Sequence, residues 1–139
     1  MKVVGVIPAA GQGTRLGPLP FSKELFPLGY ERKAGGDKSV MAPHVVSQHT
    51  LEGMREAGAG KCLIVLGPHK EDIPRYYGDG SRFGMQFAYL LQEIQNGMPS
   101  ALDLAWPWLE KDTVTLFGMP DTLFDPGPPS NFFLPPHPR

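Results

Sequence analysis

The sequence predicts an α/β protein of three layers, in which helices cover both faces of a mainly parallel sheet. Three observations lead to this prediction. Short apolar runs alternate with segments of helical periodicity, a glycine-rich loop directly follows the first apolar run, and 139 residues suit a single domain with one core. Strands that alternate with helices form βαβ units with right-handed crossovers, and these units build parallel sheets.

The first half of the chain contains two predicted strands and a long helix. Residues 2–7 form a valine-rich run that is typical of a central strand covered on both faces. Apolar residues then recur at helical spacing from Ser39 to Ala57, and Gly58 supplies a stop for that helix. The apolar run over residues 61–66 predicts the second strand.

The second half repeats the alternation. Two more strands are predicted from β-branched and aromatic residues, and Gly78, Gly80 and Gly84 mark the turn before the first of them. Pro74 suits the first turn of a short helix, whereas Pro107 lies within a longer helical pattern. The predicted elements are a loop and short helix over 68–77, a strand over 85–91, a helix over 99–109 and a strand over 113–117.

The composition changes after residue 125. The segment DPGPPSNFFLPPHPR contains six prolines, which cannot donate backbone hydrogen bonds to a sheet. We therefore expect one folded domain over residues 1–125 and an irregular proline-rich tail over residues 126–139. The functional alternative for the tail is a proline-rich ligand for a partner domain.

Composition argues against several classes of partner. With 13 basic and 14 acidic residues, the chain lacks the positive surface for nucleic acid or an anionic membrane, so we expect neither partner. The opening apolar run is too short for a signal peptide, and no stretch approaches transmembrane length. The single cysteine, Cys62, cannot form an internal disulfide, so we expect a cytoplasmic protein in which Cys62 is a small core residue.

The loop PAAGQGTRLG, residues 8–17, follows the first strand, as phosphate-binding loops do. A Walker loop is excluded because its Gly-Lys-Ser/Thr ending is absent. A dinucleotide loop needs its third glycine one place earlier than Gly17. An NAD-type protein also needs an acidic residue at the end of a second strand, whereas Glu31 lies in a glycine-rich insertion.

The remaining option is a loop that holds a triphosphate. Gly11 and Gly13 let backbone N–H groups approach phosphates, and Arg15 and Lys23 supply positive charge for the phosphate oxygens. Nucleotidyl transfer develops negative charge on the attacked phosphate and on the departing pyrophosphate, so it needs such cations and a metal ion. Asp121 follows the fourth strand at the same edge of the sheet and is the candidate ligand for magnesium.

AAGQGTRLG followed by SKELFPLG resembles the signature of the sugar nucleotidyltransferases. These enzymes join a sugar 1-phosphate to a nucleoside triphosphate and release pyrophosphate. The similarity continues through HTLEGMREAGAGKCLIVLG, YYGDGSRFGMQFAYLLQ and TLFGMPD, so it covers nearly all of residues 1–125. It implies a Rossmann-like fold of the nucleotide-diphospho-sugar transferase type, the two substrates just named, and magnesium as the cofactor.

The resemblance also implies roles for individual residues. Arg15 and Lys23 would be the catalytic cations on the phosphates, and Asp121 would coordinate magnesium. Gln92 and Gly97 would close the site of the base. The remaining nucleotide-binding positions are Ala10, Gly11, Gln12, Gly13 and Thr14.

Four of these residues also have an ordinary structural interpretation. Arg15 and Lys23 could be solvated surface cations, and Gln92 could be an exposed residue at the end of a strand. Asp121 could be a turn residue after a proline. The histidines show no ligand spacing and are interpreted as structural or surface residues, namely His44, His49, His69 and His137.

Three features depart from the family pattern. The residues between Arg15 and Lys23 are not the common form, and an insertion, YERKAGGDK, is interpreted as a surface loop or a mobile flap. Family members are also longer, and the part that this chain lacks normally supplies a second metal carboxylate, a further lysine and most of the sugar pocket. The chain therefore resembles the nucleotide-binding half of such an enzyme, which we expect to bind nucleotide better than it turns it over.

Two interpretations stay open at this point. The chain is either an active nucleotidyltransferase or a catalytically silent nucleotide-binding or assembly module derived from one. The fourth strand would lie near an unpaired edge of the sheet, and such an edge favours a homo-oligomer.

Overall fold

The computed structural model describes residues 1–32 and 40–123, so the predicted tail and positions 33–38 of the insertion lie outside the described residues. The strands in these ranges are β1 (Lys2–Ala9), β2 (Pro27–Arg32), β3 (Met41–Val45), β4 (Lys61–Leu66), β5 (Gln86–Leu91) and β6 (Thr113–Phe117). The helices are α1 (Val46–Glu56), α2 (Asp72–Tyr77) and α3 (Met98–Ala105), with short 3-10 helices η1 (Thr14–Leu16), η2 (Lys23–Leu25), η3 (Ser81–Phe83) and η4 (Trp106–Trp108). None of the helices in the described ranges has the length and apolar character to span a membrane.

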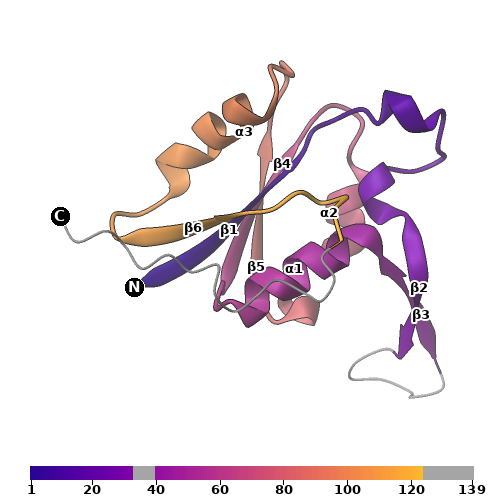
Figure 1. The fold of residues 1–139 in the computed structure, drawn as a ribbon, viewed down its shortest axis with the longest axis horizontal. Coiled ribbons are helices and arrows are strands. Elements are labelled where there is room, and N and C mark those ends of the chain that lie inside the picture. Colours follow the sequence, from indigo (N-terminus) through magenta and orange to yellow (C-terminus); the bar gives the residue numbers. More distant parts are fainter. Residues whose placement is uncertain (33–39, 124–139) are drawn as a thin grey trace.

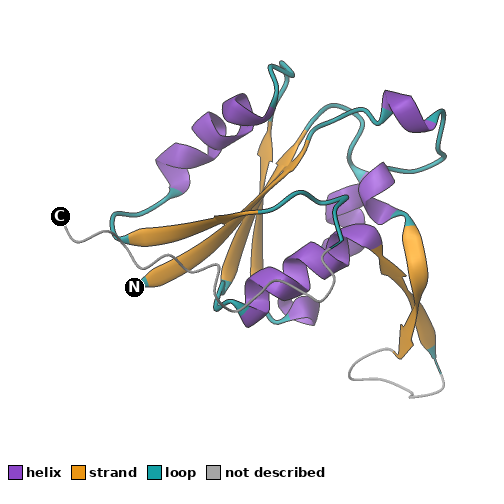
Figure 2. Ribbon diagram, viewed as in Figure 1, coloured by secondary structure: helices purple, strands orange, loops and turns teal. Residues whose placement is uncertain are grey.

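A four-stranded sheet with the order β5, β4, β1, β6 forms the centre of the molecule, and each neighbouring pair in it is parallel (Figure 1). α3 lies on one face of this sheet, whereas α1 and α2 lie on the other (Figure 2). The predicted three-layer α/β fold is therefore confirmed. Because parallel strands end at one edge, the loops after β1, β4, β5 and β6 open at the same side of the molecule.

Each face of the sheet has its own apolar core, because successive side chains of a strand point to opposite faces. The face toward α1 buries Ile7 against Leu51, and the other face buries Val6 against Ala105. Cys62 is fully buried in the first of these cores, and burial raises the pKa of its thiol. Cys62 is therefore a core residue, as predicted, and not a reactive thiolate.

The helix predicted from Ser39 to Ala57 is wrong in its first part. Residues Met41–Val45 form β3, which pairs antiparallel with β2, and α1 begins only at Val46. Pro43 explains the difference, because proline lacks the N–H that a helix interior needs but is tolerated in a short edge strand. The insertion is also not all loop, since its first three residues, 30–32, belong to β2.

The GDGSRFG motif forms the turn that precedes β5, at the opposite edge of the sheet from the glycine-rich loop. Asp79 Oδ1 accepts a hydrogen bond from Ser81 N at 2.9 Å, and hydrogen bonding with Ser81 lowers the pKa of the Asp79 carboxyl. Gly80 has a positive φ of 89°, and a Cβ there would lie 2.8 Å from Met85 O. The motif therefore shapes the start of the strand that carries Gln92 at its other end.

Candidate functional site

The loop after β1 packs against the side chain of Lys23. Gly13 has a φ of 65°, and a Cβ at this position would lie only 3.1 Å from Lys23 Cδ. A Cβ at Gly11 would lie 3.8 Å from Lys23 Nζ. Position 13 requires glycine because its backbone is left-handed and because the Lys23 side chain lies close to it. Gly11 and Gly13 together leave room for this lysine.

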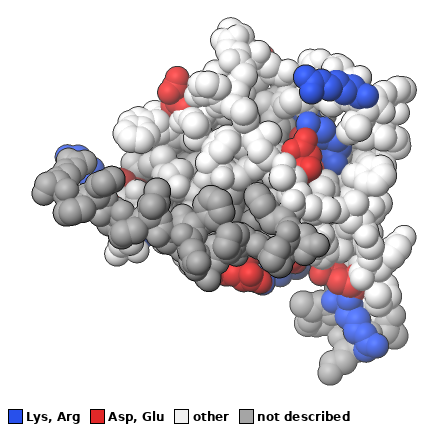
Figure 3. Space-filling view, in the orientation of Figure 1, with Lys and Arg blue, Asp and Glu red and all other residues white. Residues whose placement is uncertain are grey.

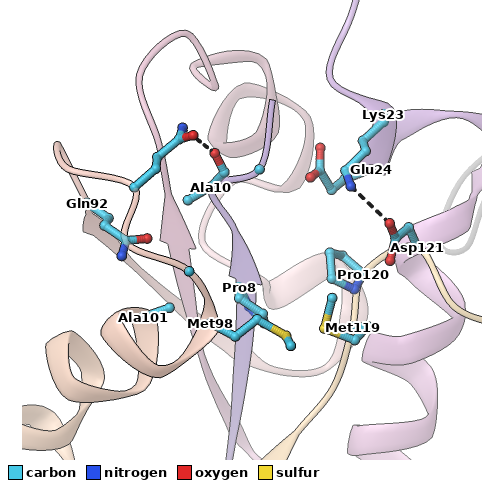
Figure 4. Close-up of a pocket in the computed structure, with 13 residues that line it drawn as sticks. Pro8, Ala10, Lys23, Glu24, Gln92, Met98, Ala101, Met119, Pro120 and Asp121 are labelled. Carbon is cyan, nitrogen blue, oxygen red and sulfur yellow. Dashed lines mark hydrogen bonds and ion pairs between the residues drawn. The ribbon is translucent and has the colours of Figure 1, made fainter. Parts of the chain in front are cut away.

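Lys23 joins this loop to the segment that follows β6. Its Nζ lies 2.9 Å from Asp121 Oδ2 (Figure 4). Thr50 Oγ1 of α1 donates a hydrogen bond to Met119 O at 2.8 Å, which anchors the segment that carries Asp121. The acid after the fourth strand therefore lies beside the glycine-rich loop, although the two are far apart in the sequence.

A second carboxylate holds the segment before Lys23 in place. Asp72 at the start of α2 accepts hydrogen bonds from Ser22 N at 2.6 Å and from Ser22 Oγ at 2.5 Å. Ser22 is buried, so both donors would be costly to leave unpaired. Asp72 therefore positions η2 and, through it, the lysine side chain.

Sequence reasoning missed a buried ion pair next to this lysine. Glu24 Oε2 lies 2.9 Å from Lys70 Nζ, and their side chains are only 2% and 7% exposed. The other oxygen of the carboxylate, Glu24 Oε1, has no hydrogen-bond partner among the described residues. The order of the strands could have pointed to this pair, because Lys70 follows β4 at the same edge of the sheet at which the glycine-rich loop opens.

Gln92 follows β5 and is buried, with 7% of its surface exposed. Its backbone N donates to Leu66 O at 2.7 Å, whereas its Nε2 has no partner among the described residues. Gln95 Nε2 donates to Ala10 O at 2.5 Å and so ties this segment to the loop after β1. The interpretation of Gln92 as an exposed residue is therefore wrong, and its amide retains a buried donor.

These segments surround a pocket of about 290 Å³, close to the lower end of the size range for small-molecule sites. In Figure 4, Gln92, Met98 and Ala101 lie on one side, and Lys23, Glu24 and Asp121 lie on the other. The lining residues are Pro8, Ala10, Gly11, Lys23, Glu24, Gln92, Gln95, Gly97, Met98, Ala101, Met119, Pro120 and Asp121.

The pocket brings together six of the predicted site residues, namely Ala10, Gly11, Lys23, Gln92, Gly97 and Asp121. The predicted positions outside its lining are Gln12, Gly13, Thr14 and Arg15. Arg15 is exposed in η1 and forms no ion pair with another described residue. Figure 3 shows basic side chains at the upper right, over the region of η1 and η2, with acidic side chains beside them.

The fold and this pocket agree with the protein family that the sequence resembles. Residues 4–126 match the family described as nucleotidyl transferase. The chain therefore belongs to the nucleotidyl transferase family, and the resemblance to the sugar nucleotidyltransferases is confirmed.

Particular relatives are moderately similar. The UTP–glucose-1-phosphate uridylyltransferase AglF of Haloferax volcanii is 32% identical over 120 residues, which are 86% of this chain and 44% of the relative. A glucose-1-phosphate thymidylyltransferase of Mycolicibacterium smegmatis is 31% identical over 128 residues, which are 88% of this chain and 39% of the relative. The chain thus spans less than half the length of these curated relatives.

A solved structure supports the fold. A Bacillus anthracis chain assigned as a glucose-1-phosphate thymidylyltransferase, in complex with a sucrose, superposes with a TM-score of 0.67 at 24% identity. The match covers 83% of this chain and 43% of the other.

Proposed function

We propose that this chain binds a nucleoside triphosphate with magnesium and transfers its nucleotidyl group to a sugar 1-phosphate, with release of pyrophosphate. One observation carries the proposal. A single pocket has the unpartnered amide donor of Gln92 on one wall and the Lys23–Asp121 pair on the other. An amide offers a donor and an acceptor to a nucleobase edge, and the opposite wall supplies charge for phosphates.

The proposed reaction is an in-line displacement at the α-phosphorus. A phosphate oxygen of the sugar 1-phosphate forms a bond to that phosphorus, while the bond to the oxygen bridging the α- and β-phosphates breaks and its electron pair leaves with pyrophosphate. Lys23 and Arg15 offset the negative charge that develops on the phosphate oxygens. These residues contribute positioning and electrostatics, and no side chain transfers a proton.

The donor set fits magnesium. Asp121 offers a hard carboxylate oxygen at the pocket wall, and magnesium is usually held by one or two carboxylates together with substrate phosphates and water. Its Oδ2 is paired with Lys23, and we propose the carboxylate of Asp121 as the protein ligand. When bound, the ion would neutralise part of the charge on the phosphates.

A calorimetric titration tests the binding step. The purified chain is titrated with ATP, CTP, GTP, UTP and dTTP in the presence and absence of Mg²⁺. We expect one of them to bind, with an affinity at least tenfold lower in Lys23→Met, because a charge-assisted contact contributes about 1.5–3 kcal/mol. Asp121→Asn should remove most of the dependence on Mg²⁺.

The matched control is Lys2→Met, which removes the lysine of an exposed pair with Glu110 outside this pocket. Its nucleotide affinity should equal that of the wild type. If no nucleotide binds, or if Lys23→Met binds as well as Lys2→Met, the proposal is wrong.

The second candidate function is a nucleotide-binding or assembly module without catalytic activity. It requires only the pocket described above, whereas the first function also requires a site for the sugar 1-phosphate. Pyrophosphate release in the presence of nucleotide, Mg²⁺ and sugar 1-phosphates distinguishes the two functions. Release above that of a Lys23→Ala variant supports transfer, whereas binding without release supports the silent module.

The single cysteine, Cys62, is buried and free. A free thiol is compatible with the reducing cytoplasm, which we propose as the location of the protein.

A further inference from the structure

Three side chains with metal-binding atoms meet on the β2–β3 hairpin and α1. His44 lies in β3, and His49 and Glu52 lie one turn apart on α1. One ligand atom from each lies within 4.8 Å of the other two. The imidazole rings of His44 and His49 have their centroids 4.2 Å apart, and His44 Nε2 lies 3.1 Å from Glu52 Oε1.

A fourth group, Glu31 of β2, lies next to this cluster. In the hairpin, Glu31 pairs with Ala42, so His44 is its diagonal neighbour on the same face. Glu31 Oε2 lies 3.8 Å from His44 Nε2. Its other oxygen accepts a hydrogen bond from Gln48 Nε2 at 2.6 Å, and this contact orients the carboxylate toward the histidine.

We propose that His44, His49, Glu52 and Glu31 form a zinc-binding site. Imidazole nitrogens and carboxylate oxygens are common zinc ligands, and two neutral imidazoles with two carboxylates balance the charge of a divalent ion. Bonds of about 2.0–2.1 Å in a tetrahedral site place ligand atoms roughly 3.3 Å apart. His44 Nε2 lies 3.1 Å from Glu52 Oε1 and 3.8 Å from Glu31 Oε2, which are close to this value. The ligand atom of His49 lies within 4.8 Å of those of His44 and Glu52, so rotation of the exposed His49 side chain would complete the site.

The site is separate from the nucleotide pocket, because none of the four residues lines that pocket. Bound zinc would join three elements that are adjacent in the chain, β2, β3 and α1. Its effect is therefore structural, since it would fix the hairpin on the helix whose Thr50 anchors the segment before Asp121.

Titration of the chain without a histidine tag tests the proposal. After treatment with a chelator, the protein is titrated with Zn²⁺ by calorimetry and with Co²⁺ by visible absorption, which is intense for tetrahedral Co²⁺. We expect one equivalent to bind with a micromolar or tighter dissociation constant, and Zn²⁺ to raise the melting temperature by mass action. His49→Ala and Glu52→Gln should each weaken binding by at least tenfold, and Glu31→Gln by a smaller factor.

The matched control is His69→Asn, since His69 is an exposed histidine with a positive φ of 64° that asparagine tolerates. This variant should bind Zn²⁺ like the wild type. His49 is exposed and Glu52→Gln preserves shape, so the metal-free variants should have the melting temperature of the wild type. The proposal is overturned if binding is weaker than micromolar in the wild type, or if His49→Ala binds as tightly as His69→Asn.

Discussion

Gly13 and Lys23 illustrate how single residues set the geometry of the pocket. The lysine passes beside the loop after β1 to reach Asp121, with its Cδ 3.1 Å from the place where a Cβ on Gly13 would be. Lys23 is also half-buried, and its Nζ is held in an ion pair. It therefore has little freedom to move away from a larger residue in the loop.

We predict that Gly13→Ala lowers both stability and nucleotide affinity. Alanine in the left-handed region costs about 1–2 kcal/mol, and its methyl group would displace Lys23 from the phosphates. Gly84→Ala is the matched control, because Gly84 has a similar left-handed backbone, with φ 70° and ψ 25°, and a Cβ there would meet only Arg55 Cδ at 3.6 Å. Urea unfolding should show similar destabilisation in both variants, while calorimetry should show reduced affinity in Gly13→Ala alone. Equal affinities would contradict the role given to this contact.

At the scale of elements, the pocket depends on how η2 is fastened to its neighbours. Glu24 of η2 reaches Lys70 after β4, and its backbone O accepts a hydrogen bond from Ser47 Oγ of α1 at 2.6 Å. Ser22, just before η2, is held by Asp72 of α2. The helices on one face of the sheet thus hold the segment that presents Lys23.

We predict a large loss of stability when one partner of the Glu24–Lys70 pair is removed. Glu24→Gln or Lys70→Met leaves the other group buried without its counter-charge, which typically costs about 3–5 kcal/mol. The double variant should lose less than the sum of the two, because no unpaired charge remains. Urea unfolding of the four proteins in a double-mutant cycle measures this coupling.

Lys2→Met supplies the comparison for that cycle. The pair of Lys2 with Glu110 is exposed, so its loss should lower the free energy of unfolding far less than the loss of the buried pair does. A similar cost for Lys70→Met would show that the buried pair has no special importance for the fold.

At the scale of the whole molecule, β6 is an edge of the sheet within the described residues. It is hydrogen-bonded to β1 on one side, and β5 forms the opposite edge. Unpaired strand edges favour association with another chain, so we propose that this chain forms a homo-oligomer.

We predict self-association through the β6 edge. Sedimentation velocity over a range of concentrations should show a dimer for the wild type and a monomer for Thr115→Lys, because a charged side chain on an edge strand opposes pairing. Thr115 is exposed, so folding should be little affected. Gln86→Lys on the β5 edge is the control and should dimerise normally. A wild-type chain that is monomeric at every concentration would contradict the prediction.

The local pattern of the sequence was sufficient for most of the fold. The four parallel strands, the short helix after β4 and α3 were predicted because their apolar periods are local properties of the chain. The loop after β1 and the acid after β6 could be placed near each other for a simple reason, that parallel strands end at one edge. The hairpin of β2 and β3 was missed because residues near Pro43 also match a helical period.

The sequence by itself determined the succession of the four parallel strands and the membership of the family. Only the tertiary structure decided that Gln92 is buried, that Glu24 pairs with Lys70, and that His44 and His49 lie together. The physical reason is that a period along the chain reports which face of an element is covered, whereas the partner of a polar side chain depends on which distant elements pack beside it.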